Sequence, residues 1–227
     1  MLKSAERREK GFFMLKVVVF DSGYGGELFA DYLENELPVM DIIRVIDWRH
    51  ADKMQSNAKI TRYIAEEALK PYFGKVDLIV FANYLLSITS LKYFKRKYKN
   101  QQFIGLSLNH PANFRYRTAI LTTKAVARTI RYKYFARQIK ARTCVLDDWP
   151  ILIDDGELGH AKIRRDLAPI LPYRPEQLIF TCTQFVDLEN ELRRIFGHNT
   201  KIINNFEQAV HDICHILKIR GALKKQK

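Results

Sequence analysis

A carboxylate, a hydroxyl and two adjacent glycines follow the first strongly apolar run of the chain, VVVFDSGYGGELF at residues 17–29. Asp21 and Ser22 offer polar side chains there, while Gly25 and Gly26 let another group approach the backbone closely. The amides at the start of the helix that follows favour an anion. Asp and Ser are also the preferred N-cap residues, so this stretch alone predicts either a ligand contact or a cap.

A cysteine stands between two threonines at the end of another apolar run, QLIFTCTQ at residues 177–184. A thiol at a helix N-terminus has a lowered pKa, which would make Cys182 a better base or nucleophile. A cysteine in a strand is otherwise a small buried hydrophobe. The flanking threonines and the position at a strand end favour the functional interpretation of Cys182.

Two more apolar runs end in polar side chains. Asn83 leaves the run VDLIVFAN, where its amide would either bind a carboxylate or cap the next helix. Thr122 and Thr123 end the run TAILTT, where hydroxyls most often serve as caps. In parallel sheets covered by helices, ligands bind beyond the carboxyl ends of the strands, so these residues are candidates for one site.

Short β-branched runs alternate with longer amphipathic stretches, which predicts an α/β fold with parallel sheets covered on both faces. The predicted strands are KVVVF, IIRVI, DLIVFA, QFIGLSL, TAILTT, QLIFTC and KIIN. Helical patterns cover residues 57–70, 124–140, 184–196 and 205–219. The last pattern places Phe206, Val210, Ile213 and Leu217 on one face, and we expect it to pack back onto the first part of the chain.

Basic residues outnumber acidic ones by 38 to 25 in the 227 residues, giving a formal charge of +13. The excess lies at both ends and in the segment 115–142. Such a balance attracts polyanions, although a solvated basic surface is the simpler explanation. No nucleic-acid-binding motif accompanies the charge, so a nucleic-acid partner stays open.

The cysteine count and the apolar runs exclude several classes. Three cysteines, Cys144, Cys182 and Cys214, lack metal-ligand spacing and argue against a disulfide scaffold or a zinc site. No apolar run approaches the roughly 18 to 20 residues of a membrane span. The run GFFML near the start is too short for the core of a secretory signal. We therefore expect a cytoplasmic protein without metal or membrane contact.

Five motifs in order resemble the aspartate/glutamate racemase superfamily, and glutamate racemase in particular, from about residue 15 to 217. VVVFDSGYGG is similar to the opening strand and Asp-Ser-Gly-x-Gly-Gly loop, and VDLIVFANYLLS stands where the family carries Ala-Cys-Asn-Thr. FIGLSLNHP resembles the Gly-Val-x-x-Pro strand. AILTTKAVARTIRYKY resembles Leu-Ala-Thr-x-x-Thr-x-x-Ser-x-x-Tyr, and LIFTCTQFVDL resembles Leu-Gly-Cys-Thr-His-Tyr-Pro-Leu.

The resemblance implies two similar parallel-sheet α/β lobes, related by a pseudo-twofold axis, with a cleft between them. The expected first lobe comprises residues 15–101 and 203–219, and the second comprises residues 102–202. Residues 1–14 would form a basic arm and residues 220–227 a basic tail. The resemblance also implies cofactor-free proton transfer by two cysteines that face opposite sides of the substrate α-carbon, since inversion needs a base on one side and an acid on the other.

The family motifs carry over to named positions of this chain. Cys182 matches the second catalytic cysteine, and no metal ligand is implied. The residues expected to bind substrate are Asp21, Ser22, Asn83, Tyr84, Thr123, Thr183 and Gln184. The implied substrate is a small amino or carboxylic acid, and a homodimer stays open.

Five departures from the family pattern fall in this expected site, and one of them is the family's Pro-Tyr-Gly segment, which falls on Asp52, Lys53 and Met54. Ala82 stands where the first catalytic cysteine belongs and cannot carry a proton, while Gln184 replaces a titratable histidine. Tyr84 and Val126 each replace a threonine. Two-cysteine racemisation therefore cannot run as in the family. General acid–base help is worth about 10²–10⁴-fold for each group, so the loss of one partner should leave at most weak racemisation.

Three functions remain open on this sequence. The first is a divergent glutamate racemase-like enzyme, an isomerase that would supply D-glutamate for peptidoglycan. The second is a single-cysteine decarboxylase or lyase, in which one thiol protonates an enolate-like intermediate. The third is a non-catalytic protein that binds an acidic partner or nucleic acid. If another residue replaces the missing thiol, the candidates are His50, Lys53 and Tyr84.

Overall fold

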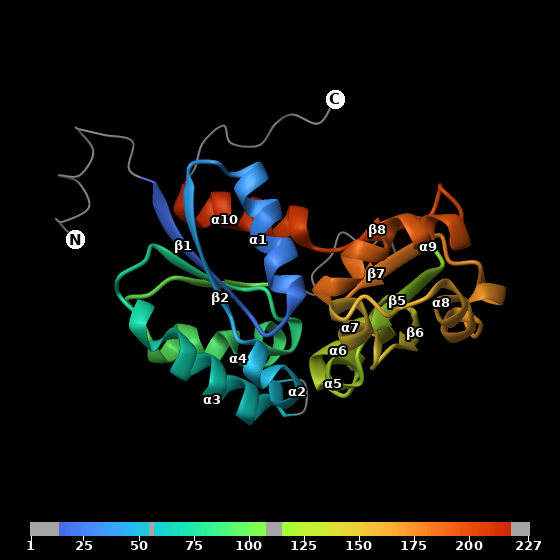
Figure 1. The fold of residues 1–227 in the computed structure, drawn as a ribbon, viewed down its shortest axis with the longest axis horizontal. Helices are drawn as coiled ribbons and strands as arrows, with labels where there is room; N and C mark the ends of the chain where they lie inside the picture. Colours follow the sequence, from blue (N-terminus) through green and yellow to red (C-terminus); the bar gives the residue numbers. More distant parts are fainter. Residues whose placement is uncertain (1–13, 55–56, 108–114, 219–227) are drawn as a thin grey trace.

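Two parallel four-stranded sheets form the two halves of the molecule (Figure 1). The computed structural model describes residues 14–54, 57–107 and 115–218. Nearly all of the predicted basic arm and the whole predicted basic tail lie outside these residues. The α/β fold class with two similar parallel sheets is confirmed.

The first sheet has the strand order β2-β1-β3-β4. Its strands are β1 (Leu15–Asp21), β2 (Met40–Ile46), β3 (Leu78–Phe81) and β4 (Phe103–Gly105), all paired in parallel. Alternate β1 residues enter different cores: Val17 and Val19 pack into one cluster, and Val18 and Phe20 pack into another. Both faces of the central strands are therefore buried, as continuous apolar runs predict.

Helices cover both faces of the first sheet. They are α1 (Tyr24–Glu36), α2 (Ala51–Met54), α3 (Ala58–Leu69), α4 (Tyr84–Lys97) and α10 (Phe206–Leu217), with short 3₁₀ turns at Trp48–His50 and Lys70–Tyr72. Buried residues of α1 and α10 share the cluster of Val17, whereas those of α3 share the cluster of Val18.

The second sheet repeats the arrangement with the order β6-β5-β7-β8. Its strands are β5 (Thr118–Thr122), β6 (Arg142–Val145), β7 (Gln177–Phe180) and β8 (Lys201–Ile203). Its helices are α5 (Lys124–Ala127), α6 (Ile130–Gln138), α7 (Trp149–Asp154), α8 (His160–Leu167) and α9 (Glu189–Phe196), with 3₁₀ turns at Leu171–Tyr173 and η5 (Thr183–Leu188).

Three sequence predictions of local structure were wrong. The run QFIGLSL was assigned to the second lobe, but its strand β4 pairs with β3 in the first sheet. Strand β6 was missed, because only Cys144 of its four residues is buried and the apolar signal is weak. The helix predicted over 124–140 breaks into α5 and α6, since the Thr129 hydroxyl accepts from the Tyr132 amide and caps α6.

Helix α10 returns the chain from the second sheet to the first (Figure 1). The ring of Phe206 lies 4.9 Å from that of Phe29 and 5.4 Å from that of Tyr32, both on α1. Val210 and Ile213 are buried in the same cluster, and Leu217 packs against it. The predicted helical face therefore docks onto the first sheet's helices, as expected. None of the helices described is long and apolar enough to cross a membrane.

Candidate functional site

Side chains from both sheets line one small cavity of about 40 Å³. The structure brings together there all eight residues that the sequence singled out: Asp21, Ser22, Asn83, Tyr84, Thr123, Cys182, Thr183 and Gln184. Met54, Leu85, Ala125, Val126 and Thr181 complete the lining. Of the lining residues, only Asp21, Tyr84 and Cys182 have side chains that ionise. The roles assigned to the eight residues stay predictions.

Asp21 is held at the end of β1 by three donors. Its Oδ1 accepts from the Ser22 amide at 2.7 Å and from Asn83 Nδ2 at 3.1 Å, and its Oδ2 accepts from Thr183 Oγ1 at 3.2 Å. Burial raises the pKa of Asp21 to about 6, although these hydrogen bonds oppose the rise. Helix α1 takes Gly23 as its N-cap, so the capping interpretation of Asp21 and Ser22 is wrong.

Asn83 combines both of the uses that the sequence left open. Its Oδ1 accepts from the Leu86 amide at 2.9 Å and caps α4. Its Nδ2 meanwhile donates to Asp21 and, at 3.4 Å, to Ser22 Oγ. The cap therefore fixes the amide in an orientation that supports the carboxylate.

Cys182 lies at the N-cap position of η5, with its thiol donating to Gln184 Oε1 at 2.9 Å. Burial raises the pKa of Cys182 well above its usual value, and the carboxylates of Asp21 and Asp154 add to the rise. The Gln184 and Phe185 amides lower it by less. The lowered pKa expected from the helix terminus is therefore wrong, because desolvation outweighs the amides. At neutral pH this thiol is a proton donor rather than a thiolate.

Asp154, at the end of α7, is a neighbour that the sequence analysis missed. Its carboxylate accepts hydrogen bonds from the Gln184 side chain and the Tyr24 amide, and burial raises its pKa. Gln184 thus lies between the Cys182 thiol and a second carboxylate. Nothing in the local sequence marks Asp154, because only the fold brings α7 next to η5.

Tyr84 is the first residue of α4, and only 4% of it is exposed. Its hydroxyl has no hydrogen-bond partner among the described residues. Burial raises the pKa of Tyr84 well above its usual value, and the nearby Cys182 contributes. Tyr84 and Val126 belong to the same apolar cluster, so these two side chains make this part of the cavity less polar.

The first-sheet helix α1 lies against η5 with almost no spare room. A Cβ added at Gly25 would lie 2.0 Å from Thr183 Oγ1, a distance that real side chains do not tolerate. The lack of a side chain at Gly25 therefore lets α1 approach η5 closely enough for Thr183 to bind Asp21.

The other candidates for a replacement proton donor do not line the cavity. His50 Nδ1 lies 2.8 Å from Asp47 Oδ2, and the Lys53 side chain is exposed. Of the three candidates, only Tyr84 reaches the cavity. Within the described residues, no group of three or more His, Cys, Asp or Glu side chains could hold a metal ion.

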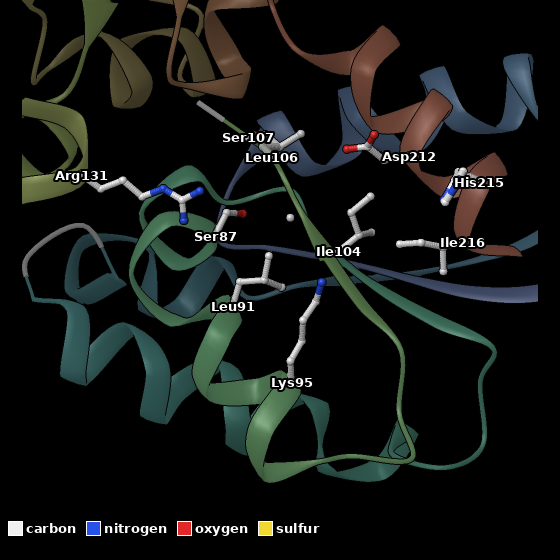
Figure 2. A pocket seen from close by; sticks show the side chains of 11 residues that line it. Ser87, Leu91, Lys95, Ile104, Leu106, Ser107, Arg131, Asp212, His215 and Ile216 are labelled. Carbon is white, nitrogen blue, oxygen red and sulfur yellow. The ribbon is translucent and has the colours of Figure 1, made fainter. Parts of the chain in front are cut away.

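A second pocket of about 250 Å³ lies between α4, β4, α6 and α10 (Figure 2). It is lined by Ser87, Leu91 and Lys95 of α4, Ile104 and Gly105 of β4, Leu106 and Ser107, Arg131 of α6, and Asp212, His215 and Ile216 of α10. None of the eight predicted site residues lines it. This pocket is therefore separate from the candidate site, although both use α4.

Comparisons with known proteins agree with this architecture. No protein-family model matches the sequence. The chain is 24% identical over 222 residues to the glutamate racemase of Ralstonia pickettii (strain 12J), covering 90% of this chain and 77% of that protein.

Solved structures give the same result for the fold. Glutamate racemase from Campylobacter jejuni has a TM-score of 0.77 at 20% identity, covering 94% of this chain and 89% of that one. Escherichia coli glutamate racemase, in complex with L-glutamate and an activator, has a TM-score of 0.76 at 19% identity, covering 93% and 86%. Allantoin racemase from Pseudomonas fluorescens has a TM-score of 0.59 at 14% identity, covering 94% and 98%. The chain therefore has the fold of the aspartate/glutamate racemase superfamily, with sequence similarity to glutamate racemase.

Proposed function

We propose that this chain is a single-thiol proton-transfer enzyme that acts on a small amino or carboxylic acid in the cavity between the two sheets. One observation carries the proposal: Cys182 of the second half and Asp21 of the first half line the same cavity. The resemblance to glutamate racemase implies that Ala82 occupies the position of the family's first thiol. The cavity retains one proton donor and one carboxylate, which is the minimum for acid–base chemistry at carbon.

Each group has a protonation state that suits its role. Asp21 is ionised above about pH 6 and takes the proton from the substrate α-carbon. The electron pair of the broken C–H bond moves into the substrate carboxylate, where Asn83, Ser22 and Tyr84 offer donors. The protonated Cys182 then gives its proton to the carbon, leaving a thiolate and a neutral Asp21. Exchange with water restores both groups, and these steps use side chains alone.

Decarboxylation is a second candidate, and the neutral thiol together with Ala82 specifically favours it. The C–C bond to a carboxylate of a malonate-type acid breaks, carbon dioxide leaves, and the electron pair stays on carbon. Cys182 delivers its proton to that carbon and is reprotonated by water. This reaction needs no base on the other side, so the loss of the first cysteine would not impair it.

The relatives support racemase-family chemistry, but they do not identify the substrate of this chain. Glutamate racemases and an allantoin racemase share this fold, and the Escherichia coli structure holds L-glutamate. Glutamate as the substrate would connect this chain to D-glutamate supply for peptidoglycan. A malonate-type substrate would instead make it a decarboxylase that has kept a racemase fold.

The test incubates the protein in deuterium oxide with L-glutamate, D-glutamate and substituted malonates. Proton NMR follows loss of the α-proton signal, and carbon dioxide release is measured in parallel. With the acid that reacts, we expect Cys182→Ala to lower the rate of α-proton exchange or of carbon dioxide release by about 10²–10⁴-fold. Cys214→Ala is the matched control, since Cys214 is a buried thiol of α10 outside the cavity. No signal above the Cys182→Ala background with any of these acids would overturn the enzymatic proposal.

A further inference from the structure

The Tyr84 hydroxyl is a buried donor without a partner inside the candidate site. Within the described residues, four side chains carry a buried polar atom without a hydrogen-bond partner: Asp47, Tyr84, Gln177 and Asn205. Of these, Tyr84 is the one that lines the cavity. A buried hydroxyl without a hydrogen bond is unfavourable, and at functional sites a ligand often supplies the missing partner.

The Tyr84 ring also limits the size of that partner. The cavity measures about 40 Å³, whereas ligand sites for larger small molecules are typically about 300–1,000 Å³. Val126 adds a second apolar group to the lining. The small remaining space favours a short acid over glutamate, whose chain is longer and also carries an ammonium group.

We propose that the Tyr84 hydroxyl donates a hydrogen bond to a carboxylate oxygen of the substrate, and that its ring restricts the site to short acids of acetate or malonate size. This inference rests on the proposed function for the location of the substrate. The position fits the chemistry: Tyr84 is close enough to Cys182 for the two groups to interact electrostatically. Its phenol also stays protonated at neutral pH, so it donates to the oxyanion that forms beside the reacting carbon.

Binding measurements on the intact chain test the inference directly. Acetate, malonate and L-glutamate are titrated by calorimetry into wild type, Tyr84→Phe and Tyr132→Phe. Tyr132 is an equally buried tyrosine, but its hydroxyl already has a partner, Thr143 Oγ1 at 2.8 Å. We expect malonate or acetate to bind wild type at least tenfold more tightly than glutamate does. Tyr84→Phe should weaken binding of the short acids about 10- to 100-fold, and Tyr132→Phe should leave it unchanged.

A second readout needs no ligand. Removal of an unpaired hydroxyl leaves no broken hydrogen bond, so Tyr84→Phe should melt at or above the wild-type temperature. Tyr132→Phe, which breaks a hydrogen bond, should melt lower. Equal binding of short acids by wild type and Tyr84→Phe would overturn the inference, as would equal affinities for glutamate and malonate.

The two proposals fail in different experiments. Short acids that bind in a Tyr84-dependent way without Cys182-dependent exchange or carbon dioxide release would support this inference and contradict the proposed function. Exchange of the glutamate α-proton that depends on Cys182 but not on Tyr84 would support the proposed function and contradict this inference.

Discussion

The two halves of the candidate site share a backbone plan but differ in chemistry. In each half, a central buried strand, β3 or β7, ends at the cavity and is followed by the residue that begins a helical segment. In the first half that residue is Asn83, preceded by Ala82, whereas in the second half it is Cys182. The first half thus contributes a carboxylate and hydrogen-bond donors to the cavity, and the second half contributes the thiol that we propose as the proton donor.

The comparison teaches how a fold keeps its shape while its chemistry changes. Ala82 is fully buried, and its amide still donates to the Phe20 carbonyl at 2.9 Å. An alanine at that position is therefore compatible with the sheet pairing.

Asp21→Asn should have the largest effect, because it removes the carboxylate that we propose as the base. We expect proton exchange at the substrate α-carbon to fall by about 10²–10⁴-fold at pH 7. In wild type, the exchange rate should rise as the pH passes about 6 and then stay level past pH 9, since the Cys182 thiol remains protonated. A rate that rises only above pH 8 would show that a thiolate, not Asp21, is the base.

The same variant should stabilise the fold. The folded pKa of about 6 exceeds the ordinary value of 3.8, so the folded state binds more protons between these values. Wild-type stability should therefore fall as the pH rises through that window, by about 3 kcal/mol in all. Asp21→Asn should be more stable than wild type at pH 7 and lose this advantage below pH 4, measured by urea unfolding. An advantage that does not depend on pH would contradict this electrostatic cause.

Gly25→Ala tests whether the two halves must touch. The added methyl group would clash with Thr183 Oγ1, so α1 and η5 would have to separate. We expect a loss of about 1–3 kcal/mol in the free energy of unfolding and weaker ligand binding. Gly159→Ala is the matched control, since nothing lies within 4 Å of a Cβ built there. Equal losses in both variants would show that the lobe contact is unimportant.

Ala82→Cys restores a thiol to the first half and should have a smaller effect. The position is buried and tightly packed, so we expect a cost of about 1–3 kcal/mol in stability. If the halves are functionally paired, racemisation of a chiral acid that already binds should increase about tenfold or more over wild type, measured by chiral chromatography. The increase should disappear in the double variant with Cys182→Ala.

Gln184→Leu should have the smallest effect. It removes the acceptor of the Cys182 thiol without changing any charge. We expect less than about a tenfold change in the exchange rate, since a neutral hydrogen bond contributes about 1 kcal/mol. A loss as large as that of Cys182→Ala would identify Gln184 as essential to the proton transfer.

The sequence predicted those parts of the molecule that depend on local pattern. Continuous apolar runs marked the buried strands, and polar residues at their ends marked Asp21, Asn83 and Cys182. It missed β6, where a mostly exposed edge strand leaves little apolar signal. It also missed Asp154, and it gave the pKa shift of Cys182 the wrong sign, because contacts between distant segments decide both.

The protonation state of Cys182 is the most direct test of this account. A variant with Cys144→Ala and Cys214→Ala leaves Cys182 as the only thiol. The ultraviolet absorbance of the thiolate is then measured from pH 5 to pH 10. The blank is the same variant with Cys182→Ala in addition. The account predicts no thiolate signal below pH 9, since burial keeps the thiol protonated. A thiolate that appears near pH 7 would contradict it and make Cys182 the base.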